Sequence, residues 1–447
     1  MSDELLAALQ AVFPKALDDL KTHVGIASVS SQPAHAADVA ASAEQVADWL
    51  REIGCPDVKV VREGGQPAVI ASFPAPDGQP TVCLYAHHDV QPTGDVERWT
   101  TPPFQADERD GRLWGRGASD DKGGVAVHLA VLRAFDGRPP VGVKLFIEGE
   151  EEIGSPSLAA ILAAHHDELA ADVFVIADSG NWDTGAPALT TTLRGVTDCD
   201  VTVSTLDHGL HSGEFGGLVP DALTCLCRLL ATLHDERGNV AVAGLKHSQA
   251  ADVEYPLERL DKESGKLSGV EWIGDGSVVQ RNWNAPSISV LALDTTRIAD
   301  ASNTLVPSAR AKVSLRVAPG DDAERAGQAL REHLLSHAPW GAHIEVTPGS
   351  VGQPAIIPVD GPGAQAAIAA MTTAWGVAPV MMGMGGSIPM ITDFQHAFPG
   401  AEVVVTAVAD PMSRPHSLDE SLDLDDWRKA AIAEALLIES LAKPSSR

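Results

Sequence analysis

Four apolar runs in this 447-residue chain are each followed by a histidine or by carboxylates. They are residues 82–86 before His87, 143–147 before Glu151 and Glu152, 173–177 before Asp178, and 403–408 before His416. Uninterrupted Val/Ile/Leu runs are typical of parallel strands buried on both faces, and ligands of open α/β sheets bind beyond the strands' carboxyl ends. Imidazole and carboxylate groups are ligands for divalent metals. The pattern therefore predicts a metal site at one edge of a parallel sheet.

Three further features belong to the same chemistry. Asp120 lies in a glycine-rich stretch, residues 115–123, that lacks the third glycine of a dinucleotide-binding loop and the Gly-Lys-Ser/Thr of a P-loop. Asp89, two residues after His87, can hold the second ring nitrogen of that histidine and fix its tautomer. The three glutamates at residues 150–152 come shortly after a buried strand, so a solvated acidic turn explains them poorly. A histidine at a strand end is more often a hydrogen-bonded structural residue, so the prediction depends on the motifs together.

The chain is long enough for two domains. Its 32 Lys and Arg against 61 Asp and Glu give a net charge of −29, which argues against nucleic acid and anionic membranes as partners. Five scattered cysteines do not form a disulfide framework, and neither a signal peptide nor an 18-residue apolar span is recognisable. We therefore expect a cytoplasmic protein.

Strand and helix patterns alternate along both ends of the chain, which favours an α/β fold with a mixed, largely parallel sheet. Between them the order is strand 200–204, helix 221–234, strands 287–293 and 309–317, helix 322–337 and strand 343–347, a ferredoxin-like βαββαβ unit. We expect residues 1–195 and 352–447 to form one discontinuous domain. Residues 196–351 form the second, with an insertion at about 236–286.

Six motifs occur in the order found in the dinuclear metallopeptidase superfamily of carnosine dipeptidases, glutamate carboxypeptidases, aminoacylases and succinyl-diaminopimelate desuccinylases. They are YAHHDVQP at 85–92, GRGASDDKG at 115–123, EGEEEIGS at 148–155, HSG at 211–213, GGSIP at 385–389, and His416. The chain resembles this superfamily over nearly its whole length, and the dipeptidase branch most closely. The resemblance implies a zinc-peptidase-like catalytic domain interrupted by a ferredoxin-like lid and dimerisation domain.

The resemblance also implies two divalent ions per subunit, Zn²⁺ or Mn²⁺. Asp120 would bridge them. His87 and Asp178 would complete the coordination of one ion, and Glu152 and His416 that of the other. Two cations sharing a carboxylate can polarise a scissile carbonyl and lower the pKa of a bridging water, the nucleophile.

The same resemblance assigns catalytic roles. Glu151 would be the general base that activates the water and then the acid that protonates the leaving amine. Asp89 would orient His87, and the peptide bond after Asp120 would be cis. His211 would reach the active site of the partner subunit and stabilise the oxyanion, which requires a homodimer.

Substrate contacts follow from the resemblance as well. Arg316 matches the arginine that binds a substrate carboxylate, a task that suits its planar fork. Asn303 is a further candidate, and Gly385, Gly386 and Ser387 are expected beside the substrate.

The chain departs from the dipeptidase pattern in one place. Relatives commonly carry Arg-Glu where this sequence has Gly383-Met384, so a charged clamp is missing or supplied from elsewhere. Glu150 replaces a residue that is often apolar. His88 and His208 match no role, and we expect both to be structural.

The leading hypothesis is a metal-dependent hydrolase of dipeptides or short peptides. An N-acyl-amino-acid amidohydrolase is the alternative, because one site geometry serves both amides. A catalytically silent homologue that only binds ligands would have lost a ligand or the base, and this chain retains them all. A serine hydrolase is excluded, because no Gly-x-Ser-x-Gly elbow follows a strand.

Overall fold

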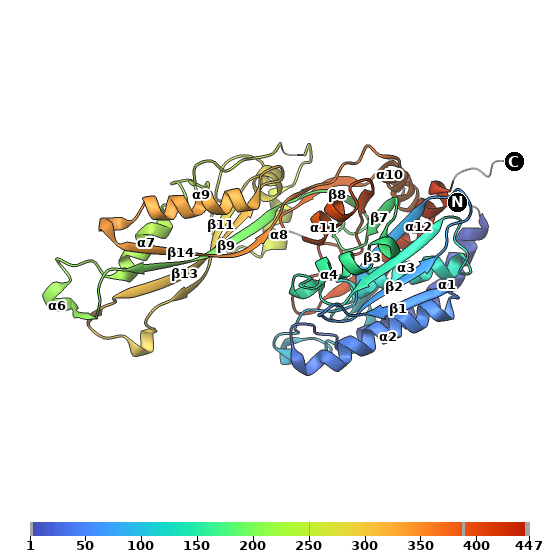
Figure 1. The fold of residues 1–447 in the computed structure, drawn as a ribbon, viewed down its shortest axis with the longest axis horizontal. Coiled ribbons are helices and arrows are strands. Elements are labelled where there is room, and N and C mark those ends of the chain that lie inside the picture. The colour runs from blue at the N-terminus through green and yellow to red at the C-terminus, as the bar shows by residue number, and fades with distance from the viewer. Residues whose placement is uncertain (1–2, 250, 387–388, 443–447) are drawn as a thin grey trace. The chain divides into compact units, whose positions relative to one another are not determined.

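The computed structural model describes residues 3–249, 251–386 and 389–442, and these pack into two units (Figure 1). Unit 1 is Met1–Thr191, Ile357–Met382 and Asp393–Arg447, and unit 2 is Thr192–Ile356 and Gly383–Thr392. The expected boundaries lay at 195/196 and 351/352, with residues 383–392 in the first domain. The segment after Met382 groups with unit 2 because Arg194 holds it, through hydrogen bonds to the carbonyl oxygens of Met384 and Gly385.

A mixed sheet, nine-stranded within the described residues, contains the strands predicted to carry the metal ligands. Its spatial order is β1 (Asp57–Val61), β2 (Ala68–Phe73), β6 (Gly142–Glu148), β3 (Thr81–His87), β7 (Val173–Ile176), β17 (Glu402–Val405), β8 (Ala188–Leu193) and β15 (Ala355–Ile356), with β16 (Val380–Met384) also paired to β8. The four central strands, β6, β3, β7 and β17, run parallel to one another. Their carboxyl ends therefore lie at the same edge, as predicted.

Both faces of the central strands are largely buried, which explains why most of their residues are apolar. On β3, Leu84 points into a large aliphatic core, whereas its neighbour Tyr85 points to the opposite face. There it meets an aromatic cluster in which Phe174 and Phe394 lie 4.7 Å apart between ring centroids. Polar side chains inside these strands are few and hydrogen-bonded: Lys144 of β6 donates to the Ala170 carbonyl oxygen at 2.6 Å, and the Tyr85 hydroxyl of β3 donates to Glu148 at 2.8 Å.

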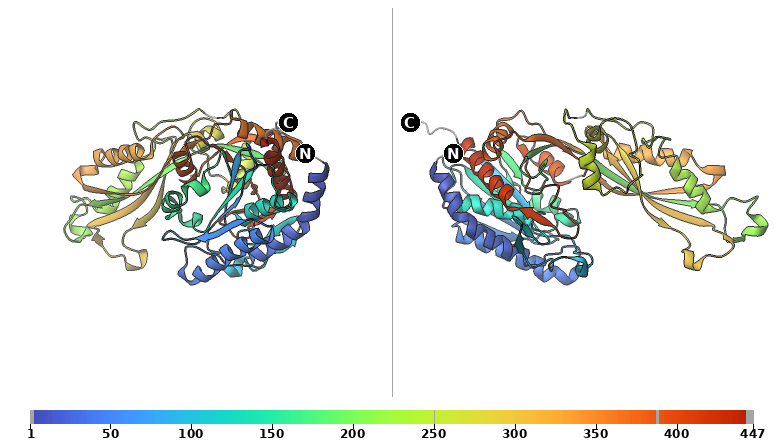
Figure 2. Two further views of the ribbon diagram at one scale, coloured as in Figure 1. Left: turned by 45° about the vertical axis from the view of Figure 1, so that its right-hand side comes forward. Right: turned by 180° about the vertical axis from the view of Figure 1, so that it is seen from behind.

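Helices cover this sheet. They are α1 (Asp3–Val24), α2 (Ala36–Glu52), α3 (Lys122–Ala134), α4 (Leu158–Ala164), α5 (His166–Leu169), α10 (Pro362–Trp375), α11 (Pro389–Ala397) and α12 (Leu424–Leu441). Figure 2 shows α12 beside α1, and α3 packs against both of these helices and against β3. A small sheet of β18 (Ser421–Asp423), β5 (Arg112–Trp114) and β4 (Asp107–Arg109) joins the loop before α3 to the segment before α12. Among the described helices, none is long and apolar enough to span a membrane.

Unit 2 has the ferredoxin-like topology. Its sheet has the order β11 (Ser287–Asp294), β13 (Ser308–Val317), β9 (Gly195–Ser204) and β14 (His343–Gly352), all antiparallel. Alternate residues of β9 are buried, and α7 (Ala222–Ala231) and α9 (Ala323–Ser336) cover that face (Figure 1). The segment expected as an insertion contains α8 (Leu257–Ser264) and ends in a short π-helical turn, Gln280–Asn284.

Candidate metal centre

The four parallel strands bring the predicted ligands of unit 1 together. His87 is the last residue of β3, Asp178 lies two residues beyond β7, and Glu151 and Glu152 form the turn after β6. His416 comes from the loop after β17, where it adopts a left-handed backbone conformation with φ of 60°. These side chains lie on five separate segments once Asp120 is included, and the sheet aligns the strands that lead to His87, Asp178 and the two glutamates.

Asp120 lies between two imidazoles. Its Oδ1 is 3.1 Å from Nε2 of His87, and its Oδ2 is 2.9 Å from Nε2 of His416. The His87 nitrogen is also 3.8 Å from Asp178 Oδ1, and the His416 nitrogen is 3.2 Å from Glu152 Oε2. Ligand atoms about 2.1 Å from one tetrahedral zinc ion lie roughly 3.4 Å apart, so these separations match two adjacent coordination shells that share Asp120.

Two groups of three potential ligands, each with its atoms within 4.8 Å of one another, share His87: one with Glu151 and Asp178, the other with Asp120 and Glu152. The distances between these atoms therefore do not show whether Glu151 binds a metal ion or only lies beside the predicted ligands. The contacts of the two oxygens of Asp120 divide the site differently, because each oxygen faces a different histidine. We assign the two ligand groups from the contacts of Asp120, because a carboxylate whose two oxygens face two different histidine nitrogens has the geometry of a bridge.

The charges of the cluster favour cations. Burial raises the pKa of Asp178 to about 7, and the carboxylates of Asp120 and Glu152 add to that effect. Burial likewise raises the pKa of Glu151 well above its usual range, reinforced by the charge of Asp178. Hydrogen bonds to Asp120 and Glu152 raise the pKa of His416 to about 10. Four carboxylates against two imidazoles leave excess negative charge even with both imidazoles protonated, so the donor set fits two divalent cations.

Asp89 and Gln91 hold the glutamate turn in place. The backbone N–H groups of Glu151 and Glu152 each donate to the Asp89 carboxylate at 3.2 Å. Nδ1 of His87 lies 3.1 Å from the Asp89 carbonyl oxygen and 3.4 Å from its carboxylate. Gln91 donates from Nε2 to the Glu152 carboxylate at 2.8 Å. Asp89 thus positions both His87 and the glutamates, and Gln91 is an orienting residue that the sequence did not reveal.

Glu420 holds the loop that carries Asp120. Its carboxylate accepts backbone N–H groups from Gly117, Ser119 and Asp120 at 2.9, 3.0 and 3.1 Å. Nη1 of Arg116 donates to it at 2.7 Å. Arg116 is 1% exposed and Glu420 fully buried, so this is an internal ion pair next to the cluster. The peptide bond between Asp120 and Asp121 is cis, as the resemblance implied.

A profile described as peptidase family M20/M25/M40 matches residues 83–440. The chain belongs to this family. A cysteinylglycine-S-conjugate dipeptidase of Corynebacterium striatum is 34% identical over 434 residues, covering 96% of this chain and 95% of that protein. The solved structure of the Saccharomyces cerevisiae dipeptidase Dug1p has a TM-score of 0.84 at 24% identity over 99% of each chain. Human carnosine dipeptidase 1 has a TM-score of 0.82 at 26% identity over 98% of each chain.

Membership of the M20 family confirms the predicted superfamily and fold class, and makes the protein a metallopeptidase. Glu150 and His88, to which the sequence assigned no role, form hydrogen bonds that support the structure of this peptidase. Glu150, 1% exposed, accepts the backbone N–H groups of Ser157 at 2.6 Å and Gln66 at 2.9 Å. His88 is buried, with Nε2 2.9 Å from the Pro67 carbonyl oxygen, and burial lowers its pKa to about 4. Through these hydrogen bonds, Glu150 and His88 hold the segments around Ser157 and Gln66–Pro67 in place.

Of the other residues expected to act on substrate, His211 and Asn303 are neighbours in unit 2. His211 ends β10 (Leu210–His211) and pairs with Thr304 of β12 (Thr304–Leu305). The Asn303 carbonyl oxygen accepts the Ser212 backbone N–H at 2.9 Å. The His211 Nδ1 accepts the Gly213 backbone N–H at 3.1 Å, which leaves its Nε2 protonated in the neutral ring.

Arg316 lies on β13, half-buried, directly opposite Ser287 of β11. Gly385 and Gly386 also belong to unit 2, whereas Ser387 lies outside the described residues. His208 is exposed and pairs with the adjacent Asp207, consistent with no further role.

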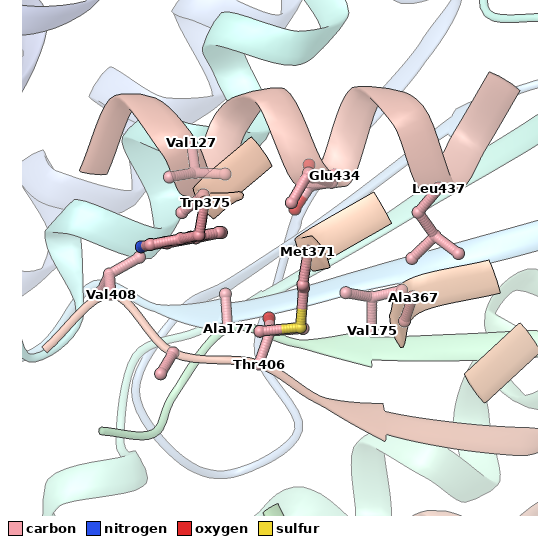
Figure 3. Close-up of a pocket in the computed structure, with 13 residues that line it drawn as sticks. Val127, Val175, Ala177, Ala367, Met371, Trp375, Thr406, Val408, Glu434 and Leu437 are labelled. Atoms are coloured by element: carbon pink, nitrogen blue, oxygen red, sulfur yellow. The ribbon is translucent and has the colours of Figure 1, made fainter. Parts of the chain in front are cut away.

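An apolar cavity of about 20 Å³ lies between α10, α12 and the sheet (Figure 3). Met371, Trp375 and Leu437 line it, together with Glu434, whose Oε1 has no hydrogen-bond partner among the described residues. That volume holds about one water molecule. None of the clustered ligands lines this cavity, so it is not the substrate site.

Proposed function

We propose that this M20-family peptidase is a dinuclear dipeptidase. One divalent cation would be held by His87, Asp120 and Asp178, and the other by Asp120, Glu152 and His416. The observation that carries this proposal is the placement of the two Asp120 oxygens, 3.1 and 2.9 Å from the two histidine nitrogens. The ligands are nitrogen and oxygen atoms without a thiolate, which suits Zn²⁺ or Mn²⁺.

Bound there, the cations would polarise the scissile carbonyl and lower the pKa of a water held between them. Glu151 would accept the proton from that water and deliver it to the leaving amine. Its location supports this, because the carboxylate is 4.0 Å from His87 Nε2 while its backbone is anchored on Asp89. A pKa raised by burial and by Asp178 suits a group that must both accept and return a proton.

Metal stoichiometry tests the assignment of the ligands. Protein stripped with a chelator and reloaded with Mn²⁺ or Zn²⁺ is expected to hold two ions per chain by elemental analysis. His416→Ala should lower the count to about one, because the second ion loses its nitrogen ligand. His208→Ala is the matched control, since His208 is exposed and paired with Asp207. A count of two in the His416 variant would remove His416 from the ligand set.

The substrate is a dipeptide under this proposal. The similarity to a cysteinylglycine-S-conjugate dipeptidase makes S-substituted cysteinylglycine the first substrate to test. β-Ala-His belongs in the panel because a Rattus norvegicus β-Ala-His dipeptidase is 31% identical over 74% of this chain. N-acyl amino acids complete it. Mass-spectrometric loss of the dipeptides supports the proposal, and loss of only the acylated compounds would assign the amidohydrolase activity instead.

A homodimer formed through unit 2 is part of the proposal. Unit 2 exposes large apolar side chains on its edge strand β11, namely Val290, Leu291 and Leu293, and Ile298 follows the strand in sequence. Exposed apolar patches of this kind mark interaction surfaces. The His211 Nε2–H, for which the described residues offer no hydrogen-bond acceptor, would donate to the oxyanion in the partner's site. Sedimentation of Leu291→Glu against wild type tests the interface; an unchanged dimer excludes this face.

We also propose a cytoplasmic location. All five cysteines are free, and four of them are buried. Unpaired thiols are typical of a reducing compartment. Fractionation of cells that produce the full chain, followed by immunodetection, tests this location.

A further inference from the structure

A cavity of about 200 Å³ lies within unit 2, where α9 packs on β9 and β14 (Figure 1). We call it the α9–β14 cavity. Its apolar wall includes Leu330 of α9 and Val346 and Val351 of β14. All residues that line it belong to unit 2, and none is assigned to metal binding or catalysis. One water molecule needs about 10–15 Å³ of such space, so the cavity has room for a small organic molecule.

A bulge in β14 makes room for this cavity. The pairing of β14 with β9 is interrupted between Pro348 and Val351, and a bulged strand bends at such a point. The hydroxyl of Ser350, inside the bulge, donates to the Asp198 carboxylate. A Cβ on Gly349 would collide with the same carboxylate, so this position requires glycine. Specific contacts therefore hold the bulge, and the cavity is built into the fold.

A buried hydroxyl group faces the cavity without a partner. Thr197 of β9 lines the cavity and is 4% exposed, and its hydroxyl makes no hydrogen bond among the described residues. Gly327 of α9 lies opposite. A Cβ there would be 3.0 Å from Thr197 Oγ1, so a larger side chain would cover the hydroxyl. Because buried polar groups are normally hydrogen-bonded, the hydroxyl indicates that a bound molecule supplies its partner.

Two opposite charges of α9 line the cavity. Glu324 and Arg331 are exposed and seven positions apart, so they share one face of the helix, about 10.5 Å apart along its axis. The other arginine and glutamate of this helix have partners: Arg325 pairs with Asp321, and Glu332 accepts a hydrogen bond from a glutamine. Within the described part of the chain, the side chains of Glu324 and Arg331 form no ion pair or hydrogen bond. Both charges are therefore available to a ligand.

The spacing of these groups indicates the class of ligand. A carboxylate and a guanidinium suit a molecule with an ammonium group at one end and a carboxylate at the other. An extended chain spans about 3.3–3.6 Å per residue, so the charges of a dipeptide are about 7 Å apart, and those of a single amino acid are closer. Flexible side chains at Glu324 and Arg331 can close the remaining gap to a dipeptide. Gly327 lies between them in the helix, so the hydroxyl of Thr197 faces the middle of the ligand, where a dipeptide has its peptide group.

We propose that the α9–β14 cavity is a second binding site, which takes a zwitterionic dipeptide with small apolar side chains. Glu324 accepts hydrogen bonds from its ammonium group, and Arg331 donates to its carboxylate. Thr197 hydrogen-bonds its peptide group, and the apolar wall contacts its side chains. This inference goes beyond the proposed function, because the cavity contains no residue of the metal cluster and binding there requires no turnover.

Calorimetric titration of the full chain with L-alanyl-L-alanine tests the site, with a chelator present so that metal-dependent hydrolysis does not enter. Acetylation of the amino group, or amidation of the carboxylate, should each weaken binding to wild type about 5- to 10-fold, because each removes a charge-assisted hydrogen bond at a partly exposed site. Arg331→Met should bind the acid no better than the amide. Glu324→Gln should bind the free amine no better than the acetylated form.

Arg297→Met is the control: it removes an exposed arginine of unit 2 that is paired with Asp300, and it should keep the wild-type preference for the acid. A preference for the acid that persists in Arg331→Met, or for the free amine in Glu324→Gln, would place the dipeptide elsewhere and overturn the site. Absence of binding to wild type would overturn it as well. Failure of the proposed function is a separate result, since it appears as absent hydrolysis by the metal-loaded enzyme and leaves this titration unchanged.

Discussion

Glu420 accepts the backbone N–H of Asp120 at 3.1 Å across 300 residues of sequence. The same carboxylate receives Arg116, so one buried ion pair fixes the loop on which the central ligand of the metal cluster lies. Glu420 itself follows His416 by four residues. The placement of Asp120 therefore depends on a carboxylate that lies outside the predicted ligand set.

Glu420→Gln should destabilise the protein by about 3–5 kcal/mol, because it leaves Arg116 buried without a counter-ion. Metal affinity should fall about 10- to 100-fold, as for other residues that orient ligands. Urea unfolding and calorimetric titration with Mn²⁺ measure the two effects. Asp425→Asn removes the exposed partner of Lys429 and should change stability by no more than about 0.5 kcal/mol. A Glu420 variant as stable as this control would refute the anchoring role.

Glu151→Gln should keep both metal ions and lower kcat by about 10²- to 10⁴-fold, because the amide cannot accept a proton. Elemental analysis and steady-state kinetics on one cleaved dipeptide measure this. The adjacent Glu150→Gln is the control: its carboxylate contacts Ser157 and Gln66, so stability should fall while kcat of the folded enzyme is kept. Unchanged turnover in the Glu151 variant would exclude Glu151 as the base.

His211→Ala should lower kcat by about 10²- to 10³-fold if Nε2 donates to the oxyanion. Action across the dimer makes a second prediction. A mixture of His211→Ala and Glu151→Gln subunits should regain activity, because a hybrid dimer holds one site with both residues intact. Subunit exchange is verified by mass spectrometry of the hybrids. Exchange without recovered activity would place His211 in its own chain's site.

His87 and Asp178 could be proposed as ligands from the sequence because each directly follows the apolar run of a buried strand. A parallel strand buried on both faces is mostly apolar, so the end of the apolar run is also the point at which His87 or Asp178 appears. Gln91 and Glu420 do not directly follow an apolar run, so the sequence offered no reason to select them. Gln91 contacts Glu152, and Glu420 contacts Asp120, at places where separate loops come together. Such contacts cannot be predicted from the local pattern of polar and apolar residues. The three-residue strands β4, β5 and β18 are likewise too short to show a period of two.

Arg194 was missed for a different reason. In the sequence, Arg194 looks like an exposed residue at the end of a strand. The structure shows that it is buried and donates hydrogen bonds to the Gly385 carbonyl oxygen and to Ser287 Oγ. The sequence did indicate that a charge was missing at Gly383-Met384. It could not indicate that Arg194 donates to the carbonyl oxygens of Met384 and Gly385, because these positions are far apart in the sequence and meet through the folding of unit 2.

A buried pair in unit 1 predicts how stability depends on pH. Nδ1 of His128 lies 2.8 Å from Glu434 Oε2, and its Nε2 lies 3.1 Å from the Tyr85 carbonyl oxygen. When the Glu434 carboxyl group carries no proton, both ring nitrogens face acceptors, and this favours the imidazolium form. Burial alone would lower the pKa of His128, but the charge of Glu434 and these hydrogen bonds outweigh burial and raise it.

Because the folded-state pKa of His128 is raised, the pair stabilises the protein fully below the unfolded value of about 6.5, and this contribution is lost as pH rises through the folded value. The free energy of unfolding of wild type relative to His128→Gln should therefore decline above about pH 6.5. Urea unfolding from pH 5.5 to 9 with chelator present measures the difference, so that metal binding does not enter. His208→Gln, at an exposed histidine, should follow the wild-type curve. A His128 variant whose stability parallels wild type at every pH would show that the imidazole is neutral, and that the proton between His128 and Glu434 belongs to the carboxyl group.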